Sequence, residues 1–325
     1  MKHSLLITLS SASLLVACGG SGGGGLGGGN SASAPVQITS ANAVSITKTS
    51  YQSALASASI GELTGETGII AGTPGGISKV SNVVSASNKT GSNTARVPIP
   101  ATESPCDVSG SVTISGQIED VITPTLSPGD FFDIEFNRCI DVPGEETDGD
   151  LHFDVDAFSG DFLGGLYDMT MTLTLDKFRV TVGEDVITSN GGATVTLNTA
   201  NSPSVSASVN GNSMTVDTNT SSESLFNFAS VQTLDGSLFP AAFTMTASGT
   251  LDTTQISGSV RYSTPLMFEG VDGDHPGIGE FLVTGDNSSA RLIAESNVNV
   301  RIELDTDGDG TTDETVNSTW AELAD

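Results

Sequence analysis

The chain has 325 residues, of which 39 are acidic and 11 basic, and its formal net charge is −28. This acid excess excludes a typical nucleic-acid binder, because phosphate contacts require a basic stripe. Three histidines and three cysteines are too few for an array of zinc sites, and a charged fraction of only 15% disfavours a coiled coil or a helical repeat.

The acidic side chains are concentrated in the C-terminal two thirds of the chain. Residues 1–100 contain only Glu62 and Glu66 against five basic side chains, so residues 101–325 carry the whole acid excess. So sharp a shift in composition predicts a domain boundary near residue 100.

Residues 1–17 have the composition of a signal peptide. A short basic start precedes an apolar stretch over residues 4–17, which as a helix would span roughly 21 Å, less than a hydrocarbon core of about 30 Å. The segment Leu15-Val16-Ala17-Cys18 resembles the lipobox of bacterial lipoproteins. The resemblance implies cleavage before Cys18 and lipidation of that cysteine. The alternative is an ordinary secretory signal with a cysteine at this place by chance.

Residues 18–30 are dominated by glycine and predict a flexible tether between the lipid and a folded domain. Gly19 stands where lipoproteins of the inner membrane often carry Asp, so the resemblance implies an anchor in the outer membrane. The expected partner of this end of the chain is therefore a membrane, and multiple acyl chains would hold it stably. No later segment has 18 consecutive apolar residues, so no membrane-spanning helix is expected.

Residues 31–105 are predicted to be a low-complexity segment with short helices and a linker. Apolar residues recur at three- and four-residue steps in 31–60, and residues 77–84 indicate a second short helix. Residues 96–105 are rich in proline and predict the linker. A disordered stalk is the alternative interpretation of residues 31–100.

From Cys106 onward, apolar and polar residues alternate. Phe132, Ile134 and Phe136, for example, alternate with acidic and amide residues. This period predicts half-buried antiparallel strands with one wet face. Residues 106–325 are therefore expected to form a mainly all-β acidic domain, either an antiparallel sandwich or an extended curved meander. Such alternation occurs within residues 108–118, 132–137, 151–156, 169–175, 195–216, 256–262, 280–284, 290–294 and 298–304.

Cys106 and Cys139 are the two cysteines that remain after Cys18. Because an exported chain occupies a compartment where disulfides persist, these residues are expected to pair. The bridge would close a loop of about 34 residues and contribute roughly 3–4 kcal/mol in the chain-entropy model. The alternative is two buried free thiols.

The segment 305–314, Asp-Thr-Asp-Gly-Asp-Gly-Thr-Thr-Asp-Glu, is the one chemical motif of the chain. Acids at its first, third and fifth positions resemble the calcium loops of EF-hand, dockerin and thrombospondin-type repeats, which wrap oxygens around one cation. The resemblance implies a calcium site as the one possible cofactor. Its ligands would be Asp305, Asp307, Asp309, Thr311 and Asp313.

The loop departs from the EF-hand at its twelfth position, where Val316 replaces a bidentate Glu. The flanking residues 298–304 and 316–320 alternate as strands do, so the loop is expected to cap a β-hairpin and not a helix pair. The alternative interpretation is an Asp/Gly-rich turn whose acids serve solubility.

No catalytic motif is found in the sequence. Gly-x-Ser-x-Gly does not occur in the domain that follows the glycine tether and His-Glu-x-x-His is absent, and His152 and His275 are expected to be surface residues. We therefore assign no catalytic residues and predict that the chain is not an enzyme.

The whole layout resembles a group of lipobox-bearing, β-rich lipoproteins of Gram-negative bacteria that have no assigned activity. Lipobox, glycine tether and a β-rich domain that opens at Cys106 carry the resemblance, together with the C-terminal Asp/Gly loop. It implies a lipid-anchored envelope protein with a structural or interaction role, calcium-stabilised through the loop. A periplasmic carrier for an apolar ligand on a curved sheet is one alternative. A carboxylate-based hydrolase of envelope polymers is another.

Overall fold

The computed structural model describes residues 32–62, 97–119, 126–161 and 165–324. The helices are α1 (Ala43–Glu62) and α3 (Trp320–Ala324). The strands are β1 (Val97–Pro105), β2 (Ser109–Ile118), β3 (Phe131–Ile140), β4 (Glu145–Asp161), β5 (Leu166–Val182), β6 (Asp185–Asn198), β7 (Ser204–Thr218), β8 (Ser222–Asp235), β9 (Ala242–Thr253), β10 (Gly258–Val271), β11 (Ile278–Gly285), β12 (Ser288–Ala294), β13 (Asn299–Asp305) and β14 (Glu314–Thr319).

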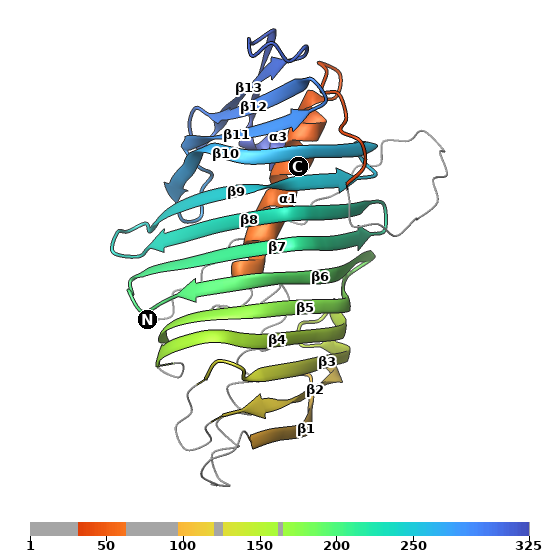
Figure 1. Ribbon diagram of the computed structural model, residues 1–325, viewed down its shortest axis with the longest axis vertical. Helices are drawn as coiled ribbons and strands as arrows, with labels where there is room; N and C mark the ends of the chain where they lie inside the picture. Colours follow the sequence, from red (N-terminus) through yellow and green to blue (C-terminus); the bar gives the residue numbers. More distant parts are fainter. Residues whose placement is uncertain (1–31, 63–96, 120–125, 162–164, 325) are drawn as a thin grey trace.

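The strands form one antiparallel sheet in which each strand pairs with its neighbours in sequence. Figure 1 shows this sheet as a long twisted ladder from β1 to β14, with α1 running across the strands. The predicted all-β antiparallel class is confirmed. The sequence left open a sandwich or an extended curved meander, and the structure is a meander. The helical segment expected within 31–60 is present as α1.

One face of the sheet is apolar because side chains alternate along every strand. In β3, Phe132, Ile134 and Phe136 are buried, whereas the acidic residues between them, Asp133 and Glu135, are exposed. The same alternation continues through β5, where buried Met and Leu residues are interleaved with threonines. The acidic side chains of these strands therefore lie on the wet face, as the sequence predicted.

Helix α1 covers the apolar face and contacts β6–β9, β11 and β12. Its buried side chains are mostly small or hydroxyl-bearing, including Thr47, Ser50, Ser53 and Ser57. Small side chains let the helix backbone approach the sheet closely. Tyr51 is the large exception, and its ring packs edge-on against Phe268 and Phe281 at centroid distances of 5.6 Å. Burial raises the pKa of the Tyr51 hydroxyl.

A carboxyl group lies under α1, where the Ser53 hydroxyl donates a 2.9 Å hydrogen bond to Glu223 of β8. Burial raises the pKa of Glu223 above its ordinary value of 4.5, and the bond from Ser53 opposes this shift. Because the raised pKa belongs to the folded state, the contribution of Glu223 to stability is complete below about pH 4 and is lost as pH rises through the folded pKa.

Glu223→Gln is expected to stabilise the protein at pH 7 by on the order of 1 kcal/mol, because the amide keeps an acceptor for Ser53 and removes the buried charge. At pH 4 the variant and the wild type should differ little. Urea unfolding of both proteins at the two pH values measures this difference. A loss of stability at pH 7 that exceeds the loss at pH 4 would show that the carboxylate itself is stabilising and would contradict this expectation.

β-Bulges bend strands β3–β5, toward the β1 end of the sheet. Arg138 of β3 and Lys177 of β5 have φ angles of 47° and 49°. Their backbone N–H groups donate to Asp148 Oδ1 at 3.1 Å and Asn190 Oδ1 at 2.7 Å in the following strand. Gly149, opposite Lys177, has φ of +104°, and a Cβ there would lie 2.4 Å from the Lys177 carbonyl oxygen. Glycine is therefore required where the strands bend.

The sheet begins earlier than the sequence indicated. Residues 97–105, predicted as part of a Pro-rich linker, form strand β1, which pairs with β2 from Val97↔Ile118 to Pro105↔Ser111. Prolines are tolerated there because β1 is an edge strand, whose outer N–H groups need no partner. The second short helix predicted for 77–84 lies outside the described residues.

Residue Trp320 was predicted to continue the last strand, but it begins helix α3. A capping box explains the change: the Thr319 N–H donates to Glu322 Oε2 at 2.9 Å, and the Glu322 N–H donates to Thr319 Oγ1 at 3.3 Å. The chain turns inward at this point, and the Trp320 ring becomes almost fully buried.

Candidate cation site

The Asp-rich loop connects β13 to β14, whose pairing runs from Asn299↔Thr319 to Leu304↔Glu314. The loop thus caps a β-hairpin, which confirms the architecture expected from its flanking sequence. Gln37, in the segment before α1, donates to the Thr306 carbonyl at 3.4 Å, and the Ser40 hydroxyl donates to Glu314. The loop therefore rests against the N-terminal segment.

Three of the predicted ligands come together. Carboxylate oxygens of Asp305, Asp307 and Asp313 lie within 4.8 Å of one another, with Asp305 half-buried and the other two exposed. Several carboxylate oxygens at such spacing are the ligand type that hard divalent cations prefer. These three residues form the candidate site.

Asp309 is not part of this group of converging oxygens. Its Oδ1 accepts hydrogen bonds from the Thr311 N–H at 2.7 Å and the Thr311 hydroxyl at 2.5 Å. Asp309 and Thr311, which were both predicted as cation ligands, are thus hydrogen-bonded to each other in a tight turn of the loop. Glu314, the last acid of the loop, accepts a hydrogen bond from the Ser40 hydroxyl.

Backbone amides fix the loop around Asp305. Its two carboxylate oxygens accept from the N–H groups of Gly308 at 2.7 Å and Gly310 at 3.0 Å. Both glycines have positive φ, 76° and 85°, which glycine adopts without steric cost. The carboxyl of Asp305 therefore has a defined orientation.

The Asp313 carboxyl receives hydrogen bonds from the Thr306 N–H and hydroxyl at 2.8 and 2.7 Å. These bonds lower its pKa below the ordinary value of 3.8. The group therefore carries its negative charge even in mildly acidic solution, as a cation ligand requires.

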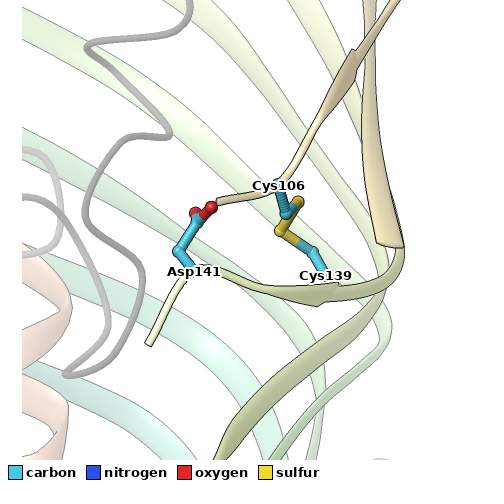
Figure 2. Close-up of side chains that lie close together, drawn as sticks. All are labelled: Cys106, Cys139 and Asp141. Carbon is cyan, nitrogen blue, oxygen red and sulfur yellow. A yellow bond between two sulfur atoms is a disulfide. The ribbon is translucent and has the colours of Figure 1, made fainter. Parts of the chain in front are cut away.

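A second cluster of sulfur and carboxylate atoms lies at the other end of the sheet. Figure 2 shows that the sulfurs of Cys106 and Cys139 are joined and that Asp141 lies beside them. The Cα atoms of the two cysteines are 5.6 Å apart. The predicted disulfide is present, so these sulfurs do not serve as thiolate ligands, and Asp141 Oδ1 instead accepts the Asp107 N–H at 2.9 Å.

His152 lies on the wet face of β4, as predicted, between two carboxylates. Its Nδ1 is 2.6 Å from Asp133 Oδ1 and its Nε2 is 3.1 Å from Asp154 Oδ2. Partial burial lowers the pKa of His152, but the hydrogen bonds and charges of both aspartates outweigh it, and the net shift is upward. The arrangement stabilises an imidazolium across β3 and β4.

Because the folded-state pKa of His152 is raised, its contribution to stability is complete below about pH 6.5 and is lost as pH rises through the folded pKa. We expect His152→Gln to destabilise the protein by less than 1 kcal/mol at pH 5.5, since the pair is partly exposed and screened. Near pH 9 the variant should match the wild type in urea unfolding. A constant difference at both pH values would contradict this assignment.

Other carboxylates on the wet face oppose each other directly. Glu135 pairs with Asp150, and Asp150 pairs with Asp176 on its other side. Like charges in such cross-strand positions are destabilising. The carboxylates on this face of β3–β5 therefore favour hydration of the sheet and do not stabilise the pairing of its strands.

Cys18 and the tether lie outside the described residues. Within the described ranges, no helix combines the length and the apolar composition needed to cross a membrane. No protein-family model matches this chain, and neither a characterised protein nor a solved structure matches it significantly.

Proposed function

We propose that this chain is a lipid-anchored protein of the bacterial outer membrane with a structural or interaction role and no catalytic role. The observation that carries the proposal is the lipobox-like segment ending at Cys18, followed directly by glycine-rich residues. The meander adds a broad, solvated acidic face without carrying a catalytic motif of its own. A tether and a long sheet together suit a module that presents a surface at a distance from a membrane.

Mass spectrometry of the mature N-terminus tests the anchor. We expect a chain that begins at Cys18 and carries acyl groups, and Cys18→Ser should abolish both the acyl mass and membrane fractionation. A mature chain with an unmodified Cys18 would refute the anchor.

We propose further that the loop of Asp305, Asp307 and Asp313 binds calcium. Three converging carboxylates support this, as does the ionised state of Asp313. For an affinity of about 10⁻⁴–10⁻³ M, typical of extracellular modules, 10 mM calcium would stabilise the protein by roughly 1.4–2.7 kcal/mol.

A thermal melt with and without 10 mM calcium should therefore show a rise in Tm of roughly 3–8 °C. Asp307→Asn should lose this rise, because it removes one ligand charge from the converging group. Asp272→Asn, in an Asp-rich turn outside the group, is the matched control and should keep it. An unchanged wild-type melt would reject the site.

The carrier alternative is not favoured over β6–β9, β11 and β12, because α1 occupies the apolar face there. A hollow of about 210 Å³ between β8, β9 and β10 is lined by small apolar and hydroxyl side chains, among them Ser230, Thr246 and Thr264. No carboxyl group lines this hollow, so it does not favour the hydrolase alternative either.

A further inference from the structure

The hairpin between β8 and β9 ends in two exposed apolar side chains. Leu238 is 58% exposed and Phe239 is 98% exposed, the highest value among the large hydrophobic residues that the structure describes. The base of the hairpin is held by the Asp235↔Ala242 pair and by a 3.0 Å bond from the Ser237 N–H to Asp235 Oδ1. The tip is therefore a defined projection and not a loose end.

Further apolar side chains extend from the tip along β10 and β11. A bulge between Leu266 and Glu269 leaves both Leu266 and Met267 exposed, and Val271 pairs with Ala242 at the base of the hairpin. We call the following residues the tip patch: Leu238, Phe239, Leu266, Met267, Val271 and Ile278. Clustered apolar exposure of this kind marks an interaction site.

The charges around the tip patch are acidic. No lysine or arginine lies between Arg179 and Arg261 or between Arg261 and Arg291. Glu269, opposite Ile278, lies among the β10–β11 residues of the patch, and Asp272 follows Val271. An anionic surface would be repelled at this place. The occupant should therefore be apolar and carry no net negative charge.

We propose that the hairpin end of the tip patch, Leu238 with Phe239, inserts into the boundary between headgroups and acyl chains of a bilayer rich in zwitterionic lipid, while the β10–β11 part of the patch, which contains Glu269, stays at the headgroup level. A projecting Phe beside a Leu is convex, so it fits a fluid apolar medium without a preformed pocket. This inference rests on the proposed function, because the lipid on Cys18 would hold the protein at that bilayer.

The length of chain before the described residues permits both contacts at once. Pro35 forms a bridge with Ser259 at the start of β10, while Val271 at its other end adjoins the tip hairpin. In Figure 1, residues 32–42 and the β8–β9 connection lie at opposite ends of these strands. The separation is about 40 Å along β10 and about 10 Å more to the hairpin tip, and the 17 residues from 18 to 35 reach at most about 60 Å. The anchor and the tip can therefore occupy one membrane surface.

Phe239→Trp in the full lipidated chain, added to phosphatidylcholine vesicles, tests the insertion. The native Trp320 is only 1% exposed and gives a constant background. We expect blue-shifted emission from the new Trp and strong quenching when the vesicles contain brominated phosphatidylcholine. Val108→Trp is the matched control, since Val108 is 54% exposed in the β1–β2 turn, and it should remain unquenched.

Flotation of the same samples separates the two proposals. Vesicles that carry the protein without preferential quenching of the Phe239→Trp variant would leave the anchor standing and overturn the insertion. Protein that does not float with the vesicles and whose Phe239→Trp emission is not quenched would overturn both the anchor and the insertion. The Cys18→Ser variant should retain some vesicle binding through the tip. Combining it with Phe239→Ser should lower that remaining binding about 10-fold or more. A blue shift produced by an envelope protein fraction, but not by vesicles, would assign the tip to a protein partner and contradict the proposal.

Discussion

Trp320→Ala is expected to destabilise the protein by about 3–5 kcal/mol. The ring lies 5.3 Å from Tyr51, 5.9 Å from Phe268 and 5.7 Å from His275, measured between centroids. It therefore joins α1 to β10 and to the β10–β11 connection, and its removal opens a cavity at this junction. Urea unfolding followed by far-UV circular dichroism measures the loss, because the variant has no Trp to report.

The Trp320 Nε1–H also donates to the carbonyls of Pro276 and Ser296, each at 3.0 Å. Trp320→Phe keeps most of the ring volume and loses only these bonds, so it should cost about 1–2 kcal/mol. This variant is the control that separates packing from hydrogen bonding. A loss below 1 kcal/mol for Trp320→Ala would show that the junction does not hold the C-terminal strands.

Removing the disulfide is the second large effect. The double substitution Cys106→Ser and Cys139→Ser is expected to cost about 3–4 kcal/mol, because the unfolded chain regains the freedom of a loop of about 34 residues. The bridge joins the end of β1 to β3, so it secures the edge of the sheet across β2. Chemical denaturation of wild type and double variant measures the difference.

Reduction provides the control for that experiment. A reductant should lower the stability of the wild type by a similar amount and leave the double variant unchanged. Protection of β1 and β2 amides from hydrogen exchange should fall more than that of β11–β13, which lie far from the bridge. Equal stability of oxidised and reduced wild type would show that strand pairing alone secures this edge.

Strict alternation made part of the sheet predictable. Strand β3 alternates without interruption from Phe132 to Phe136, and every apolar residue there is buried. Strand β8 was missed, because a bulge at Asn227 with φ of 47° places the buried residues Leu225 and Phe228 three positions apart. Strand β9 was missed because two of its inward positions are Ala247 and Gly249, whose small side chains give little hydrophobic signal.

The cation site could be predicted only in part. Spacing along the sequence brought Asp305, Asp307 and Asp309 to attention, but it cannot say which carboxylates turn toward their own backbone. The folded loop brings oxygens of Asp305, Asp307 and Asp313 together and leaves Asp309 bonded to Thr311. The start of α3 had a readable signal, since Thr319 followed three residues later by Glu322 is a capping-box sequence. The tip Leu238-Phe239 had none, since exposure of apolar residues depends on which neighbours the fold supplies.

The position of α1 sets an order on how the chain assembles. Because each strand pairs with the one made just before it, the ladder can grow step by step during N-to-C synthesis. Helix α1 emerges before any strand, yet its contacts extend to β12, more than 220 residues later. The helix can therefore complete its packing only after β12 has been synthesised and paired. The side chains that α1 finally buries include Thr47, Ser50 and Ser53. While these residues are still exposed on the incomplete chain, their hydroxyl groups make aggregation less favourable than a fully apolar helix face would.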